Sequence, residues 1–178
     1  MSKISSVKKS IITAVCMALC VVLPMAFHAV QNAGSIFLPM HIPVLLCGLI
    51  CGWQYGLICG IIGPLLSSLL TGMPPAAYLP VMMIELAVYG LVSGFLSQRI
   101  HTGKSLLDTY ISLIGAMLAG RLVAGLARAL IFARGSYSFQ TWAVGYFVTG
   151  LPGIIIQIVL VPAILVALEK ARLIPARD

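Results

Sequence analysis

The chain has 178 residues and a formal net charge of +7, and 61% of its residues are hydrophobic while only 8% are charged. A soluble domain carries roughly a quarter charged residues and could not bury this much apolar surface, so the composition excludes a soluble globular protein. Most basic residues stand at the ends of apolar runs, which indicates membrane topology and not a nucleic-acid partner.

The predicted elements are six membrane-spanning helices, so the chain is expected to be an all-α integral membrane protein with one membrane domain over residues 1–178. Residues 36–70 contain no Asp, Glu, Lys or Arg. As one helix they would be about 50 Å long, too long for a single crossing, and we expect a tight turn at the polar break of residues 52–56. The helices are expected at about residues 10–28, 42–53, 56–71, 77–97, 107–133 and 142–168.

Small residues recur within the second and third predicted helices. Glycine occupies every fourth position at Gly48, Gly52, Gly56 and Gly60. This spacing lets helix backbones approach closely in a membrane, and it predicts packing of these two helices. The cysteines also lie in apolar runs without a CxxC pair, which predicts packing roles and no disulfide framework: Cys16, Cys20, Cys47, Cys51 and Cys59.

The basic residues predict the orientation of the helices. With six spans, the loops on one side of the membrane contain a single basic residue, Arg134. Because basic residues accumulate on the cytoplasmic side, we expect both termini in the cytoplasm. The basic residues on that side are Lys3, Lys8, Lys9, Arg99, Lys104, Lys170, Arg172 and Arg177.

Three ionisable side chains lie inside predicted spans, namely Glu85, Arg121 and Arg128. Glu85 and Arg128 each lie about 10 Å below the outer surface and could form an ion pair that only fixes helix packing. Arg121 lies one heptad deeper, at a depth similar to that of Gln157. Two arginines and one carboxylate leave a surplus positive charge, which favours an anionic or strongly polar ligand. Arg128 is the first candidate for binding it.

The outward loops add further groups that could line a pocket. Asn32 and His41 flank the first of these loops, and Trp142 and Tyr146 lie beside the last. Aromatic residues at a membrane boundary are more often interfacial anchors than ligand platforms. No second His, Asp or Glu stands near His41 in the sequence, so we expect neither a metal site nor a cofactor.

The sequence contains no recognisable enzyme motif. Residues 103–105 (GKS) resemble the end of a phosphate-binding loop, but Gln98 occupies the place of its first glycine. We therefore expect no enzymatic activity, and any energy for transport would come from another chain or from an ion gradient. Ala14 and Ala18 form an AxxxA pattern in the first helix, which favours close contact with a partner helix.

Together, these features resemble the S components of energy-coupling factor (ECF) vitamin transporters. The resemblance covers nearly the whole chain in its size, its six spans and its cytoplasmic termini. The stretches most similar to the family are residues 14–18 (AVCMA), 34–43 (GSIFLPMHIP), 70–75 (LTGMPP) and 120–125 (GRLVAG).

The resemblance implies a substrate-binding subunit in the plasma membrane of a prokaryote. Such a subunit binds one water-soluble vitamin or precursor from outside, between the first and last outer loops and helices four to six. Its partners are a transmembrane coupling subunit, which would contact Ala14 and Ala18, and two cytoplasmic ATPases. The positions of Glu85, Arg121, Arg128 and Gln157 agree with the implied pocket.

For the substrate, the sequence predicts a chemical class and several candidate vitamins. The surplus of arginine favours a carboxylate or phosphate, which pantothenate fits best, ahead of pyridoxine, a thiamine precursor, riboflavin or a queuosine precursor. Two other classes stay open. One is a non-transport membrane scaffold with a structural Glu85–Arg128 pair, and the other is a solitary ion-coupled transporter.

Overall fold

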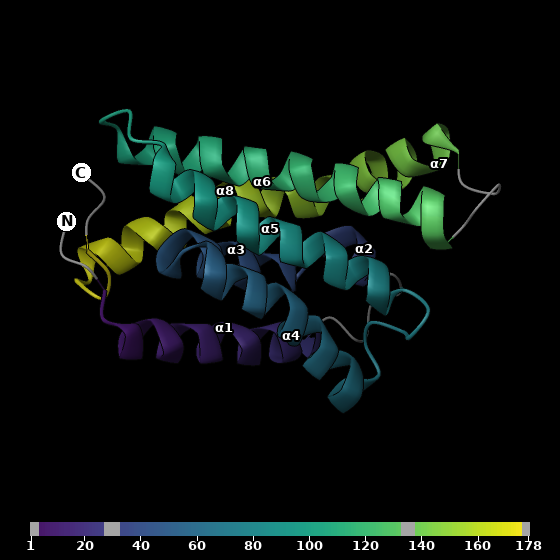
Figure 1. The fold of residues 1–178 in the computed structure, drawn as a ribbon, viewed down its shortest axis with the longest axis horizontal. Helices are drawn as coiled ribbons and strands as arrows, with labels where there is room; N and C mark the ends of the chain where they lie inside the picture. Colours follow the sequence, from purple (N-terminus) through teal and green to yellow (C-terminus); the bar gives the residue numbers. More distant parts are fainter. Residues whose placement is uncertain (1–3, 27–32, 133–137, 176–178) are drawn as a thin grey trace.

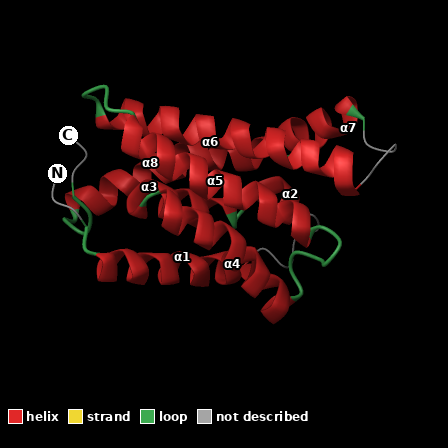
Figure 2. Cartoon of the chain, viewed as in Figure 1, coloured by secondary structure: helices red, strands yellow, loops and turns green. Residues whose placement is uncertain are grey.

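The computed structural model describes residues 4–26, 33–132 and 138–175. The chain is 84% helical, and the described residues form no strand (Figure 2). In chain order the helices, of which η1 and η2 are π-helices, are α1 Ser6–Ala26, α2 Ala33–Phe37, α3 His41–Cys51, α4 Trp53–Thr71, α5 Leu79–Arg99, α6 Ser105–Ala127, η1 Arg128–Phe132, α7 Phe139–Ala143, η2 Val144–Thr149 and α8 Leu151–Lys170.

The fold confirms the all-α class with six membrane spans. Among the described residues, six helical segments are long and apolar enough to cross a membrane, and all of them except Gly34–Cys51 expose large apolar side chains that suit contact with lipid. They are Ser6–Ala26, Gly34–Cys51, Trp53–Thr71, Leu79–Arg99, Ser105–Phe132 and Leu151–Lys170. Figure 1 shows the two termini at one end of the bundle and α7 at the other, which we call the distal end.

The helix α3 is the centre of the bundle. Every residue of α3 except Ile50 is buried. Its sequence is apolar on all sides, as expected for a helix surrounded by protein. It packs against α1, α4, α5 and α8, and the α4–α5 and α5–α6 interfaces complete the bundle.

The reversal between α3 and α4 takes a single residue, Gly52. Its φ of +97° lies in the region that favours glycine. The turn is therefore shorter than the predicted residues 52–56, and α4 begins directly at Trp53. A Cβ at Gly56 would meet both the Cα of Gly48 and the carbonyl oxygen of Gly90. The spaced glycines thus bring α4 close to α5 as well as to α3.

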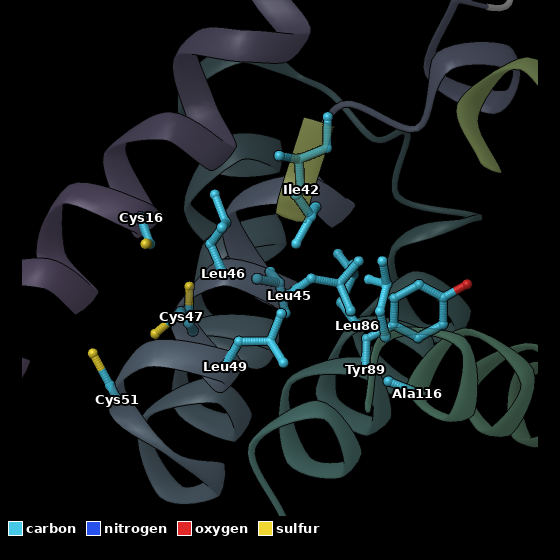
Figure 3. Close-up of a cluster of buried hydrophobic side chains, with 14 of the residues drawn as sticks. Cys16, Ile42, Leu45, Leu46, Cys47, Leu49, Cys51, Leu86, Tyr89 and Ala116 are labelled. Atoms are coloured by element: carbon cyan, nitrogen blue, oxygen red, sulfur yellow. The ribbon is translucent and has the colours of Figure 1, made fainter. Parts of the chain in front are cut away.

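The buried thiols come from α1, α3 and α4. All five cysteines are buried and free. The Cys47 thiol lies 3.5 Å from Thr13 Oγ1, and the Cys51 thiol lies 3.7 Å from the carbonyl oxygen of Lys9. Figure 3 shows these two side chains on the α1 side of the core and Tyr89 on the opposite side, beside Ala116 of α6. The thiols and the Tyr89 ring therefore lie on opposite sides of the core.

The structure differs from the prediction at the distal end. The predicted loop before His41 contains the short helix α2, and the expected helix over residues 142–168 is divided. Its first part forms α7 and η2, and α8 begins only after Gly150. Pro152 stands in the first turn of α8, where its missing N–H costs no helical hydrogen bond, so a new helix starts there. The helix predicted to end at residue 133 becomes π-helical from Arg128.

Candidate functional site

Buried polar side chains from α3, α5 and α6 meet in the distal half of the bundle. His41, Glu85 and Arg121 are only 1%, 7% and 2% exposed. The Nε2 atom of His41 lies 3.4 Å from Oε1 of Glu85, within ion-pair distance but outside hydrogen-bond geometry. The structure therefore places His41 beside the carboxylate for which the sequence suggested Arg128. Depth along a helix does not determine which neighbouring side chain faces Glu85.

Arg121 links α5 to the segment before α8. Its Nε donates to the Tyr89 hydroxyl at 2.9 Å, and its Nη1 donates to the carbonyl oxygen of Tyr146 at 2.7 Å. The guanidinium also lies over the ring of Phe147, 5.4 Å from the centroid. Within the described chain these partners are all neutral, and an arginine keeps its charge in proteins. A buried positive charge of this kind attracts an anionic ligand.

Tyr89 connects His41 to Arg121. The His41 and Tyr89 rings pack edge to face with centroids 5.1 Å apart, and the Tyr89 hydroxyl accepts the bond from Arg121. A Cβ at Gly120 would overlap the Tyr89 ring, so this glycine makes room for it. Tyr89 was not among the residues predicted from the sequence. The available signal was its position one turn after Glu85, on the same face of α5.

Gln157 lies on α8, which packs against α2, α3 and α6. It is fully buried, and neither polar atom of its side chain has a hydrogen-bond partner among the described residues. The same holds for both ring nitrogens of His41. Leaving a buried polar group unpaired costs about 1–3 kcal/mol. His41 and Gln157 thus each keep buried polar atoms without a hydrogen-bond partner among the described residues.

Aromatic residues of α7 and η2 cover Arg121. Trp142 Nε1 donates to the backbone oxygen of Arg121 at 3.1 Å, and its ring packs against those of Phe139, Tyr146 and Phe147. A Cβ at Gly125 would meet this indole, so the glycine lets Trp142 approach α6. Trp142 thus holds the segment against α6, and the Tyr146 backbone positions the guanidinium.

Arg128 lies at the edge of this cluster. It is half-buried at the distal end of α6, with its guanidinium 5.2 Å from the centroid of the Tyr78 ring. It is also the first residue of η1, and π-helical turns are frequent at functional sites. Asn32, the remaining candidate, lies outside the described residues.

Ala14 and Ala18 lie away from the cluster, on α1. Both are exposed, whereas α1 turns Thr13, Cys16 and Cys20 toward the core. The AxxxA pattern is therefore accessible to another helix in the membrane.

The model of the family described as "ECF transporter, substrate-specific component" matches residues 8–165, from α1 into α8. No curated protein and no solved structure matches the sequence.

Proposed function

This chain belongs to the family of substrate-specific components of ECF transporters, and on that basis we propose that it captures a water-soluble vitamin that carries a carboxylate or phosphate. Pantothenate is the first candidate. As a member of this family, the chain is a substrate-binding transporter subunit and not an enzyme, and it works with ECF coupling and ATPase modules.

The observation that supports an anionic substrate is the buried guanidinium of Arg121 with neutral partners in the described chain. In this proposal Arg121 and Arg128 bind the acidic group of the vitamin. The unpaired atoms of His41 and Gln157 bind its polar groups, while Glu85 orients the His41 ring. Tyr146 and Trp142 line the entrance at the distal end, and Asn32, outside the described residues, stays a candidate from the sequence.

The same proposal assigns an orientation. The distal end faces the outside of a prokaryotic plasma membrane, and both termini lie in the cytoplasm, as the basic residues favour. A transmembrane coupling subunit contacts α1 at Ala14 and Ala18, and two cytoplasmic ATPases supply the energy. The vitamin then enters from the side of α2 and α7.

Mass spectrometry of small molecules released from the detergent-purified protein tests this function directly. We expect one vitamin molecule per chain, with an acidic group. If the protein is empty and binds no vitamin of a panel that includes pantothenate, the proposal fails and a scaffold is favoured. Uptake in a host without a coupling subunit, abolished by an uncoupler, would instead establish a solitary ion-coupled transporter.

Replacing Gln157 by methionine separates a ligand contact from a packing role. The change removes a buried, unpaired amide at similar volume, so we expect the ligand-free protein to become more stable by about 1 kcal/mol. Vitamin affinity should fall about ten-fold, because the amide is lost as a binding group. Thermal unfolding and titration calorimetry measure the two effects.

Gln54→Met is the matched control, since Gln54 lies on α4 and is exposed. We expect this control to change neither the stability of the ligand-free protein nor its affinity for the vitamin. If Gln157→Met raised stability and left affinity unchanged, Gln157 would not belong to the vitamin site.

A further inference from the structure

A groove lies between α6 and α8, apart from the polar cluster. Its volume is about 470 Å³, within the range of about 300–1,000 Å³ that is usual for small-molecule sites. It contains none of the residues proposed to bind the vitamin. Its lining includes Leu106 and Tyr110 of α6 and Val159, Ala163, Ala167 and Lys170 of α8.

The length of the groove matches one leaflet of a membrane. Along α8 its lining runs from Val159 to Lys170, the last residue of the helix. Eleven residues of helix rise about 16 Å, close to half of a hydrocarbon core of about 30 Å. With Lys170 at the membrane surface on the side of the termini, the groove would extend to about the middle of the bilayer.

The chemistry of the lining changes along this length. Val159 is 64% exposed and Leu106 is 53% exposed, so the apolar walls are open to lipid. Ala163 and Ala167 are small and exposed, which leaves room above α8. At the surface end the groove terminates at the exposed Lys170, while the neighbouring Glu169 is not part of the lining. Tyr110, with an apolar ring and a polar hydroxyl, is typical of a membrane boundary.

From this arrangement we propose that the groove binds an anionic phospholipid of the leaflet on the side of the termini. One acyl chain lies along α8, and the phosphate group contacts Lys170. Basic residues near a membrane surface attract anionic lipids, and the charge here stands where the headgroup of such a lipid would lie. A helix of a partner protein would extend past the middle of the membrane, whereas this groove stops there.

Photo-crosslinking in lipid nanodiscs tests the proposal without reference to the vitamin. The protein is placed in phosphatidylcholine discs that contain a trace of photoactivatable phosphatidylglycerol or photoactivatable phosphatidylcholine, and labelled peptides are identified by mass spectrometry. We expect the anionic probe to label residues 159–170 about five-fold more than the zwitterionic probe. One basic residue near a membrane surface strengthens the binding of an anionic lipid by about this factor. Lys170→Gln should reduce this ratio to about one.

Lys8→Gln is the charge-matched control, because Lys8 is exposed near the same end of the bundle but does not line the groove. It should leave the ratio unchanged. The double variant Ala163→Leu, Ala167→Leu fills the groove and should reduce labelling by both probes. Each variant is compared only as a monodisperse sample.

Equal labelling by the two probes in the wild-type protein would overturn the proposal, as would an unchanged ratio in Lys170→Gln. Protection of residues 159–170 from both probes, together with a dimeric mass by light scattering, would also overturn it. In that case a second copy of the chain covers the groove.

Discussion

Replacement of Arg128 by alanine is expected to weaken vitamin binding by about 10- to 100-fold. A hydrogen bond to a charged group contributes about 1.5–3 kcal/mol, which corresponds to this range of affinity. Arg128 is half-buried at the distal end, with its guanidinium over the exposed Tyr78 ring, so the core does not depend on its packing. The variant should therefore remain folded in the membrane. Titration calorimetry with the vitamin recovered from the wild-type protein measures the loss.

Arg99→Ala provides the matched control. Arg99 also ends a membrane-spanning helix and lies over an aromatic ring, with its guanidinium 5.2 Å from the centroid of Phe95. It is at the opposite end of the bundle, so its removal should not change affinity. Equal affinity in the wild type and in Arg128→Ala would remove Arg128 from the site and leave Arg121 as the candidate for binding the anion.

Tryptophan at both Ala14 and Ala18 is expected to abolish uptake while vitamin affinity stays unchanged. Small residues four apart allow another helix to approach α1 closely, and two indoles would prevent this contact. Both positions are exposed and lie on a different helix from every proposed binding residue, so the site itself is not altered. Uptake of labelled vitamin in cells that contain the coupling and ATPase modules measures transport, and calorimetry on the purified variant measures binding.

Leu19→Trp tests whether any bulky residue on α1 has this effect. Leu19 is exposed as well, but it points about 100° away from Ala18 around the helix. We expect it to support normal uptake. Normal uptake in the Ala14→Trp, Ala18→Trp variant would contradict the assignment of this interface, and loss of affinity there would show that the change disturbs the bundle.

Residues with strong local signals were predictable from the sequence. Gly52 interrupts an uncharged run that is too long for one crossing, so a reversal near it follows from the thickness of the membrane. Glu85, Arg121 and Gln157 were identified because polar groups inside apolar spans are expensive and therefore informative. The structure places all three in the buried distal half.

The distal segments were harder to predict, because their apolar composition favours one continuous helix while Gly and Pro residues favour a break. Residues 142–168 are apolar throughout apart from Thr149 and Gln157 and are long enough for one helix, but Gly150 and Pro152 start a new helix within them. Hydropathy averaged over a span does not resolve such a break. The apolar pattern likewise does not predict the π-helical geometry that begins at Arg128 and at Val144.

The membrane class, the six spans and the polar residues within them follow from the order of the amino acids, because they depend on how many apolar residues stand between charges. The partners of those polar residues became known from the packed bundle. It placed His41 beside Glu85, and it placed Tyr89 and the Tyr146 backbone around Arg121. These contacts depend on the rotation and tilt of each helix relative to its neighbours, and that geometry is set by side-chain packing across the whole bundle.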